Sequence, residues 1–459
     1  MRALIPFLIE ILIISCISFF LLSKAPAPML PSPKVDALSF YLGNVDAIKT
    51  NSYIYNLALT SIQSYVNNCL GSDYYQPITK QCLNQSYMSL TAIDSLDTAL
   101  IIGASKEYEQ LRDYVTESFS CANINHFIST HDLITHVIGG LISAYSLSSD
   151  RVFLEKAVEC AQISLSAFNS QIPNPLIHGK AGSSKPYPWI SGTTLSDSSG
   201  FPLEFTALTK LTKISKYSKH VNNYFSCINK LIHDYNNLPV LFLSTSTCSV
   251  TRNLSGLTSN SVGFFSNLLR THLYNPQKET SEIIKWFENK FDQTNLKTIL
   301  SVADTTHTRF HSSLCQLIPL LNSLDKEEFP NVNKIASKLT EKCQQLMNDK
   351  LPSVSGKFGR NYISVDDDEF DFDSSFIENV LLTKKNLKDL KFLEKMNFDC
   401  NGTVCGLYTQ DPTKVKKNML SLEGLNKWLK YLSLENATFS YSLYVFNEAG
   451  HLIPKVPPE

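Results

Sequence analysis

Apolar residues recur along most of this chain at helical spacing, and the recurrences come in neighbouring pairs. Leu154, Val158, Ala161, Leu165 and Phe168 follow one another at steps of 4, 3, 4 and 3, which places them on one face of a helix. Comparable patterns occupy residues 133–145, 203–211, 221–232 and 422–432, and strand-like alternation is scarce. The pattern therefore predicts an all-α fold of stacked helical hairpins, most of it in one large domain.

Helical hairpins of this kind either stack into a solenoid or close into a ring. No fixed short repeat is visible, which argues against the common solenoids, and the pattern alone leaves closure open. Lys and Arg together number 41, against 42 Asp and Glu. Because no basic excess is present to neutralise phosphates, we exclude nucleic acid as a partner.

The N-terminal segment indicates the compartment. Residues 3–22 are mostly apolar, with Glu10 as the charged exception, and a run of about 20 apolar residues can span a bilayer. A removed signal peptide usually has a shorter apolar run and an Ala-x-Ala cleavage site, which Ala25–Ala27 could provide. We therefore expect a signal-anchor or signal peptide at 1–24, a Pro-rich tether at 25–40 and a lumenal domain at 41–455. The chain would be a single-pass type II membrane protein of the endoplasmic reticulum or Golgi, or secreted if the signal is cleaved.

Sequons and cysteines agree with this compartment. Glycosylation sequons begin at Asn84, Asn253, Asn401 and Asn436, and ten of the eleven cysteines lie outside the apolar segment, as suits an oxidising lumen. Cys69 with Cys82 and Cys400 with Cys405 could close short loops, although sequence alone does not fix pairing. No CxxC or Cys/His cluster has zinc-ligand spacing, so the sequence does not predict a zinc site.

Several ordered motifs resemble one known family. They are Thr91-Ala-Ile-Asp-Ser-Leu-Asp-Thr98, Gly139-Gly-Leu-Ile-Ser-Ala-Tyr145, Leu203-Glu-Phe205 and Tyr444-Val-Phe-Asn447 with His451. From about residue 57 to 452 the chain resembles glycoside hydrolase family 47, the class I α-1,2-mannosidases. The resemblance implies an (α/α)7 barrel, Ca²⁺ at the barrel floor and inverting removal of α-1,2-linked mannose from high-mannose N-glycans. It also implies that Cys315 and Cys343 form the family's disulfide.

The resemblance also assigns candidate residues. The family's acid, a Glu, and the Arg four residues later fall on Asp132 and His136. Aspartate keeps the acidic chemistry on a shorter side chain, but Asp132 at a helix start could equally be a cap, and His136 could be an ordinary helix residue. Glu204 and Glu423 match glutamates of the glycan pocket; the alternative for both is a surface position on the polar side of a helix.

Other catalytic positions are replaced. The family's catalytic Asp falls on Val262, which cannot accept a proton or hold a nucleophilic water. Glu378 matches a family Glu, whereas Ser375 replaces the Glu before it. The acidic run 366–373 either supplies a substitute carboxylate or is a solvated loop. The family's calcium-binding Thr falls on Glu448, whose carboxylate is a hard oxygen ligand of the kind Ca²⁺ takes.

Three hypotheses follow for the function. The first is an inverting α-1,2-mannosidase that trims high-mannose N-glycans, with Asp132 and Glu378 catalytic. The second is a lectin in glycoprotein quality control that binds the same glycans without cleaving them, and the replaced carboxylates favour it. The third is a membrane-tethered scaffold without a glycan ligand.

Overall fold

The computed structural model describes residues 37–43, 52–235, 239–293, 309–347, 355–358, 363–364, 399–400, 403–407, 416–420, 422–434 and 441–455. The expected N-terminal anchor and most of the tether lie outside these ranges, as do Glu378, Ser375 and the acidic run. Among the helices in these ranges, none combines the length and the apolar character needed to cross a bilayer.

Helices make up most of the described structure. The α-helices are α2 (Ala37–Leu42), α3 (Ser52–Cys69), α4 (Leu90–Ile102), α5 (Ser105–Glu117), α6 (Thr130–Asp132), α7 (Gly139–Ser148), α8 (Arg151–Ser164), α9 (Pro202–Thr212), α10 (Lys216–Tyr235), α11 (Ser259–Tyr274), α12 (Lys278–Gln293), α14 (Leu317–Asn322), α15 (Val332–Met347) and α18 (Lys430–Ser433). Short 3-10 turns are η2 (Cys121–Asn123), η4 (Leu165–Ala167), η5 (Asp197–Ser199) and η6 (Ser312–Gln316). Two segments are π-helical, η3 (Leu133–Ile138) and η8 (Glu423–Leu429).

The strands are short and form small antiparallel sheets at the ends of helices. They are β1 (Tyr74–Gln76), β2 (Gln81–Leu83), β3 (Phe127–Ser129), β4 (Leu176–His178), β5 (Ser183–Lys185), β6 (Thr193–Thr194), β7 (Val240–Leu243), β8 (Val250–Ser255), β9 (Arg309–His311), β10 (Ser355–Phe358), β11 (Ile363–Ser364), β12 (Asp399–Cys400), β13 (Thr403–Leu407), β14 (Lys416–Leu420), β15 (Tyr444–Phe446) and β16 (Leu452–Pro454). Their sheets run β1-β2, β3-β4-β5, β6-β7-β8, β11-β10-β9, β12-β13-β14 and β15-β16. The registers of the β3-β4-β5 sheet pair Ile128 with Ile177 and Ile177 with Ser184.

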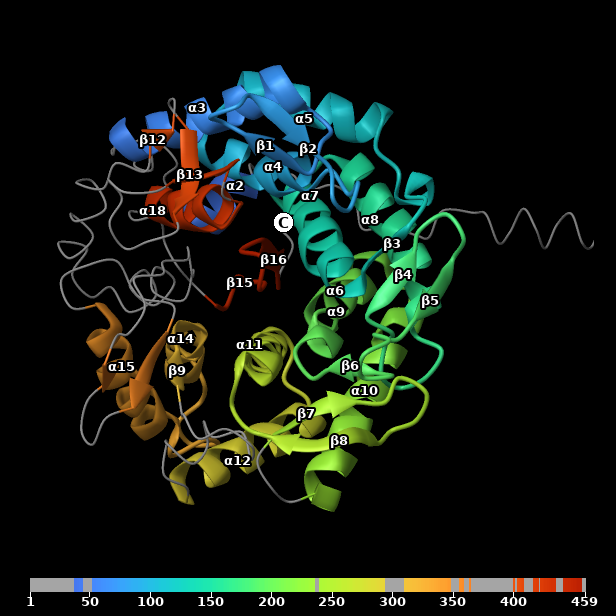
Figure 1. Ribbon diagram of the computed structural model, residues 1–459, viewed down its shortest axis with the longest axis vertical. Helices are drawn as coiled ribbons and strands as arrows, with labels where there is room; N and C mark the ends of the chain where they lie inside the picture. Colours follow the sequence, from blue (N-terminus) through green and yellow to red (C-terminus); the bar gives the residue numbers. More distant parts are fainter. Residues whose placement is uncertain are drawn as a thin grey trace, which may run out of the picture.

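The helices form two concentric rings (Figure 1). Helices α4, α7, α9, α11 and α14 form the inner ring, and each packs against the next. Each also packs against the helix that follows it in the pair, respectively α5, α8, α10, α12 and α15, and these lie outside. At the end of the chain η8 and α18 contact α3 and α4, so the ring closes. The structure therefore decides for a ring and against a solenoid.

Apolar patterning explains which helix of a pair lies inside. In α4 every residue except Leu100 is buried, as expected for a helix covered on all sides. In α5 the buried residues are Glu107, Tyr108, Leu111 and Val115, one stripe that faces inward while the rest of the helix is polar.

Local signals fix the ends of these helices. Asp150 accepts a hydrogen bond from the amide of Val152 and so caps the start of α8. Gly103 ends α4 in the left-handed region, at φ 72°, where a residue without a β-carbon is favoured.

Disulfides link the helices and their connections. Cys315 pairs with Cys343, as the family resemblance implies, and Cys69 pairs with Cys82, as their spacing suggested. Cys400 is also disulfide-bonded. Two pairs that the sequence did not indicate are Cys121–Cys160, between η2 and α8, and Cys227–Cys248, between α10 and the β7–β8 connection.

Candidate functional site

The C-terminal hairpin β15–β16 lies inside the ring of helices (Figure 1). Its turn carries Asn447, Glu448 and His451, and the amide of His451 donates to Oδ1 of Asn447 at 2.8 Å. Gly450 has φ 82°, a left-handed conformation that favours glycine. The turn therefore places an amide, a carboxylate and an imidazole in the middle of the barrel.

A pair of glycines allows the inner helix to approach this turn closely. A β-carbon at Gly139 would overlap the side-chain amide of Asn447, and one at Gly140 would lie 3.3 Å from Nε2 of His451. The Gly139-Gly140 motif of the sequence thus serves the contact between α7 and the hairpin.

The deepest part of the site is a charged network that we call the inner network: Asp94, Asp97, His136, Lys430 and His451. His136 Nδ1 lies 2.8 Å from Asp94 Oδ2, and His451 Nε2 lies 3.1 Å from Asp94 Oδ1. The other nitrogen of His451 lies 2.9 Å from Asp97 Oδ2, and Lys430 donates to both oxygens of Asp97 at 2.8 and 2.9 Å. Burial alone would raise the pKa of both aspartates, but the cationic neighbours, His136 for Asp94 and Lys430 for Asp97, outweigh it and lower both pKa values.

Both π-helical segments contribute to this network. His136 lies in η3, and Lys430 follows directly after η8. A π-turn inserts one residue into a helix and rotates the side chains that follow, which is why such segments are frequent at functional sites.

Glu204 lies beside the inner network. It lies in the first turn of α9, is 3% exposed, and accepts a hydrogen bond from Asn447 Nδ2 at 2.9 Å. Burial raises the pKa of Glu204 to about 7. The alternative of a surface position for this residue is therefore wrong.

His131, Asp132 and Glu448 form the more accessible part of the site, which we call the outer triad. His131 lies between the two carboxylates, with Nδ1 3.3 Å from Asp132 Oδ1 and Nε2 3.2 Å from Glu448 Oε2. Asn267 donates to the same oxygen of Glu448 at 2.7 Å. The side chain of Asp132 is 46% exposed, that of Glu448 25% and that of His131 17%.

The charges of the outer triad stabilise one another. Burial alone would lower the pKa of His131, but its hydrogen bonds to Asp132 and Glu448 raise it well above 6.5. Burial would likewise raise the pKa of Glu448, yet the bond from His131 lowers it to about 2, and the pKa of Asp132 is lowered for the same reason. The triad therefore holds an imidazolium between two carboxylates at neutral pH.

The helix-cap alternative for Asp132 is wrong. Ser129 accepts the hydrogen bond from the Asp132 amide at 3.1 Å, and the Asp132 side chain makes no cap bond. Its carboxylate instead faces His131. His136, the other residue placed by the same motif, bonds to Asp94.

The structure describes only some of the remaining predicted positions. Val262 is 1% exposed in α11, so an apolar side chain occupies the place expected for a catalytic Asp. Glu423 begins η8, but its side chain lies outside the described residues, as does Glu378 altogether. The structure therefore brings together Asp132, His136, Glu204 and Glu448.

Sequence reasoning missed several residues of this site. Four of them lie within the motifs that resemble the family, but the motifs assigned them no role: Asp94, Asp97, Asn447 and His451. No sequence signal pointed to His131, Asn267 and Lys430, because each has a partner that is far away along the chain.

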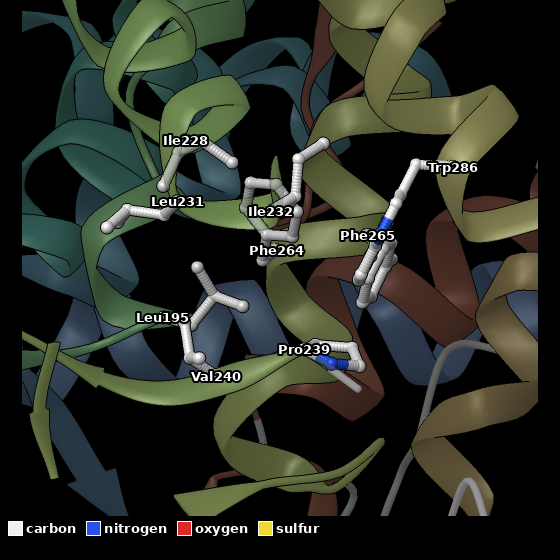
Figure 2. A pocket seen from close by; sticks show the side chains of 9 residues that line it. All are labelled: Leu195, Ile228, Leu231, Ile232, Pro239, Val240, Phe264, Phe265 and Trp286. Atoms are coloured by element: carbon white, nitrogen blue, oxygen red, sulfur yellow. The ribbon is translucent and has the colours of Figure 1, made fainter. Parts of the chain in front are cut away.

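A separate apolar pocket lies between α10, α11, α12 and β7 (Figure 2). Leu231, Phe264 and Trp286 are among the residues that line it, and its free volume is about 20 Å³. This is room for about one water molecule. The polar centre of the barrel, and not this pocket, is therefore the candidate site.

Comparisons with known proteins agree with this architecture. The family model for glycosyl hydrolase family 47 matches residues 57–326. The endoplasmic reticulum mannosyl-oligosaccharide 1,2-alpha-mannosidase of Mus musculus is 27% identical over 272 residues, which cover 56% of this chain and 41% of the relative. The mannosyl-oligosaccharide 1,2-alpha-mannosidase MNS1 of Arabidopsis thaliana is 27% identical over 258 residues, 55% of this chain and 45% of the relative. The matches thus span less than half the length of these relatives.

One solved structure shows the fold. The α-1,2-mannosidase from Trichoderma reesei superposes with a TM-score of 0.76 at 15% sequence identity, over 88% of this chain and 98% of that one. The two rings of helices are accordingly an (α/α)7 barrel. With the family model covering more than half of its length, the chain belongs to glycosyl hydrolase family 47 as an α-1,2-mannosidase-like protein.

Proposed function

We propose that this chain binds mannose residues of high-mannose N-glycans at the outer triad and holds them without hydrolysis. The observation that carries the proposal is the contact of His131 with the carboxylates of both Asp132 and Glu448. Inverting hydrolysis needs one carboxylic acid that protonates the leaving oxygen. The pKa of Asp132, at the acid position, is lowered by its bond with His131, so Asp132 has no proton to give at neutral pH.

The other carboxyl groups of the site do not replace it. Glu448 is held ionised by His131. Glu204 has a pKa of about 7 because of its burial, but its side chain is enclosed and bonded to Asn447. Among the described residues, the site therefore offers acceptors and an imidazolium donor, which suit sugar hydroxyls that both donate and accept hydrogen bonds.

The choice of ligand is supported by the relatives. The matched proteins from Mus musculus and Arabidopsis thaliana are named as mannosyl-oligosaccharide 1,2-alpha-mannosidases, and the barrel is that of an α-1,2-mannosidase. Val262 lies at the position where the family's catalytic Asp is expected. Its presence removes a catalytic group but leaves the barrel, which favours retained glycan binding over retained hydrolysis.

Hydrolysis is the second candidate, and one contact favours it. Glu448 Oε1 lies 3.2 Å from the position that a β-carbon would take at Gly263, next to Val262. A carboxylate from the hairpin thus reaches the region in which the family's catalytic Asp is expected. In this reading Glu448 would activate the water, and the acid would be Asp132 in a form protonated only when a glycan displaces His131.

Calcium is not part of the proposal. Ca²⁺ takes six to eight oxygen ligands, whereas the described groups that contact Glu448 Oε2 are the N–H donors His131 and Asn267. Glu448 is already paired with His131. We expect excess calcium to leave the melting temperature of the chelator-stripped chain unchanged.

For the compartment we propose the secretory pathway, in the endoplasmic reticulum or Golgi lumen. The disulfides between Cys69 and Cys82, and between Cys315 and Cys343, support it, because disulfides persist in oxidising compartments. Residues 1–24 would anchor the chain or be removed.

The test is one purified chain in two assays with a labelled high-mannose N-glycan. The first measures release of mannose, and the second measures retention of the glycan on the immobilised protein. Asp132→Asn and Glu448→Gln are compared with Asp113→Asn, which changes an exposed aspartate on α5 (60% exposed side chain). Each site variant should weaken retention by about tenfold or more, the value of a hydrogen bond to a charged group, and the control should not.

The outcomes separate the hypotheses. Retention without release, lost in the site variants, supports the lectin. Release that Asp132→Asn abolishes refutes it and establishes the hydrolase. Neither retention nor release refutes both and leaves the scaffold.

A further inference from the structure

We propose that Asp94, His136 and His451 form a binding site for a divalent transition-metal ion, with zinc as the best-fitting ion. One ligand atom of each residue lies within 4.8 Å of the other two. Two imidazole nitrogens and one carboxylate oxygen are a ligand set typical of zinc sites that keep a fourth position open. Calcium and magnesium prefer oxygen ligands, so this set selects a different class of ion.

The three ligands come from parts of the chain that only the fold brings together. Asp94 lies in α4, His136 in the π-helical segment η3, and His451 follows the turn after β15. The carboxylate oxygens lie 2.8 Å from His136 Nδ1 and 3.1 Å from His451 Nε2. The two contacts use different oxygens of Asp94. Ligand atoms of a tetrahedral ion bound at about 2.0–2.1 Å lie about 3.3–3.4 Å apart, so the observed separations are shorter by about half an ångström or less, a difference that small side-chain rotations provide.

The second nitrogen of His451 has the partner that a metal-bound histidine needs. Its Nδ1 lies 2.9 Å from Asp97, and Asp97 also accepts hydrogen bonds from Lys430 and Ser143. A carboxylate in this position fixes the imidazole with its proton on Nδ1. The lone pair of Nε2 then points at the anionic oxygen of Asp94, and this contact is favourable only with a cation, a proton or a metal ion, between the two atoms.

The fixed charges of the inner network are compatible with a divalent cation. Asp94 and Asp97 carry two carboxylates, and Lys430 supplies one ammonium group beside Asp97. A divalent ion between Asp94 and the two histidines would therefore lie beside a carboxylate that Lys430 does not contact.

Access and packing fit the same site. The side chains of Asp94 and His451 are 1% and 0% exposed, whereas that of His136 is 20% exposed, so an ion can enter on the His136 side. A β-carbon at Gly140 would lie 3.3 Å from His451 Nε2, so the glycine keeps a side chain away from this nitrogen. The site shares no residue with the outer triad, so it does not depend on the proposed glycan binding.

The experiment uses the full chain without a histidine tag, stripped with chelator and then titrated with Zn²⁺ by calorimetry and with Co²⁺ by visible absorption. We expect one ion per chain, a rise in melting temperature with zinc, and no response to Ca²⁺. His136→Gln and Asp94→Asn keep the side-chain size and should weaken zinc binding by at least about 100-fold, since even outer partners contribute 10–100-fold. His233→Gln, an exposed histidine on α10, is the matched control.

Melting of each variant without metal shows that it is folded. The proposal is overturned if the native chain takes up no zinc, or if a folded His136→Gln or Asp94→Asn variant binds zinc as tightly as the native chain and the His233→Gln control. In that case Asp94 and its two histidines are a hydrogen-bonded structural network only.

Discussion

Replacing His131 by Gln removes the cation that lies between Asp132 and Glu448. Loss of one partner from a buried ion pair costs about 3–5 kcal/mol, and exposed pairs contribute about 0–1 kcal/mol. The side chains of His131 and Glu448 are 17% and 25% exposed, nearer the buried limit. We therefore expect His131→Gln to lower the free energy of unfolding by about 2–3 kcal/mol.

The pKa of Glu448 gives an independent check on this magnitude. Burial alone would raise it, but His131 brings it from 4.5 to about 2, which corresponds to about 3 kcal/mol. Asn267 and Lys427 contribute part of that stabilisation, so the share of His131 is smaller. The two routes agree on about 2 kcal/mol as the central expectation.

The pH of the measurement follows from the sign of each shift. The Glu448 contribution, from a lowered pKa, is complete above about pH 4.5 and is lost as the pH falls towards 2. The His131 contribution, from a raised pKa, is complete below about pH 6.5 and is lost as the pH rises through its folded value. The full effect is therefore expected between these limits, at about pH 5.5.

Urea unfolding at that pH is measured for His131→Gln, Glu448→Gln and the double variant. Glu448→Gln alone should cost about 1 kcal/mol, since the imidazolium keeps Asp132. The double variant should be little worse than His131→Gln, with a coupling of about 1 kcal/mol. The control is the pair Lys278–Glu282, whose side chains are 83% and 44% exposed. Its expected coupling energy is about 0.3–0.5 kcal/mol. If the effects of His131→Gln and Glu448→Gln add to within about 0.5 kcal/mol, the reasoning is refuted.

Three further changes test the site and the fold. Burial raises the pKa of Glu204 to about 7, so the folded state holds a proton that the unfolded state releases above about pH 4.5. Glu204→Gln should therefore stabilise the chain by up to about 3 kcal/mol at pH 8 and by little at pH 4. Urea unfolding at both pH values measures the difference. A β-carbon at Gly200 would overlap the ring of His131, so Gly200→Ala should cost about 1–3 kcal/mol, and much of this should vanish in the His131→Gln background. Loss of the Cys315–Cys343 disulfide, which closes a 28-residue separation, should cost about 3–4 kcal/mol, seen as a lower melting temperature.

Much of the fold was predictable because helical periodicity is a local property. The stripe from Leu154 to Phe168 predicted α8 with η4, and the run 203–211 predicted α9. The interruption of helix 133–145 by a π-turn was not predicted, since the apolar pattern is the same on either side of one inserted residue. Closure of the ring also depends on contacts between α3, α4 and the last helices, which no single segment specifies.

The candidate site was predictable only where a motif carried it. Asp132, Glu204 and Glu448 were named from motif positions, and the structure places all three around the polar centre. Their protonation states were not predictable, since the low pKa of Asp132 comes from His131 and the high pKa of Glu204 comes from its burial. Both causes exist only in the folded chain.

The sequence by itself determined the paired helices and the family's motifs, because spacing and residue type act within one segment or in fixed order along the chain. The tertiary structure alone decided which charges meet. Asp94 and His451 lie 357 residues apart, and Lys430 reaches Asp97 from the other end of the chain. The energy of a buried charge depends on the partners that the closed barrel places around it, and those partners are set by packing between helices.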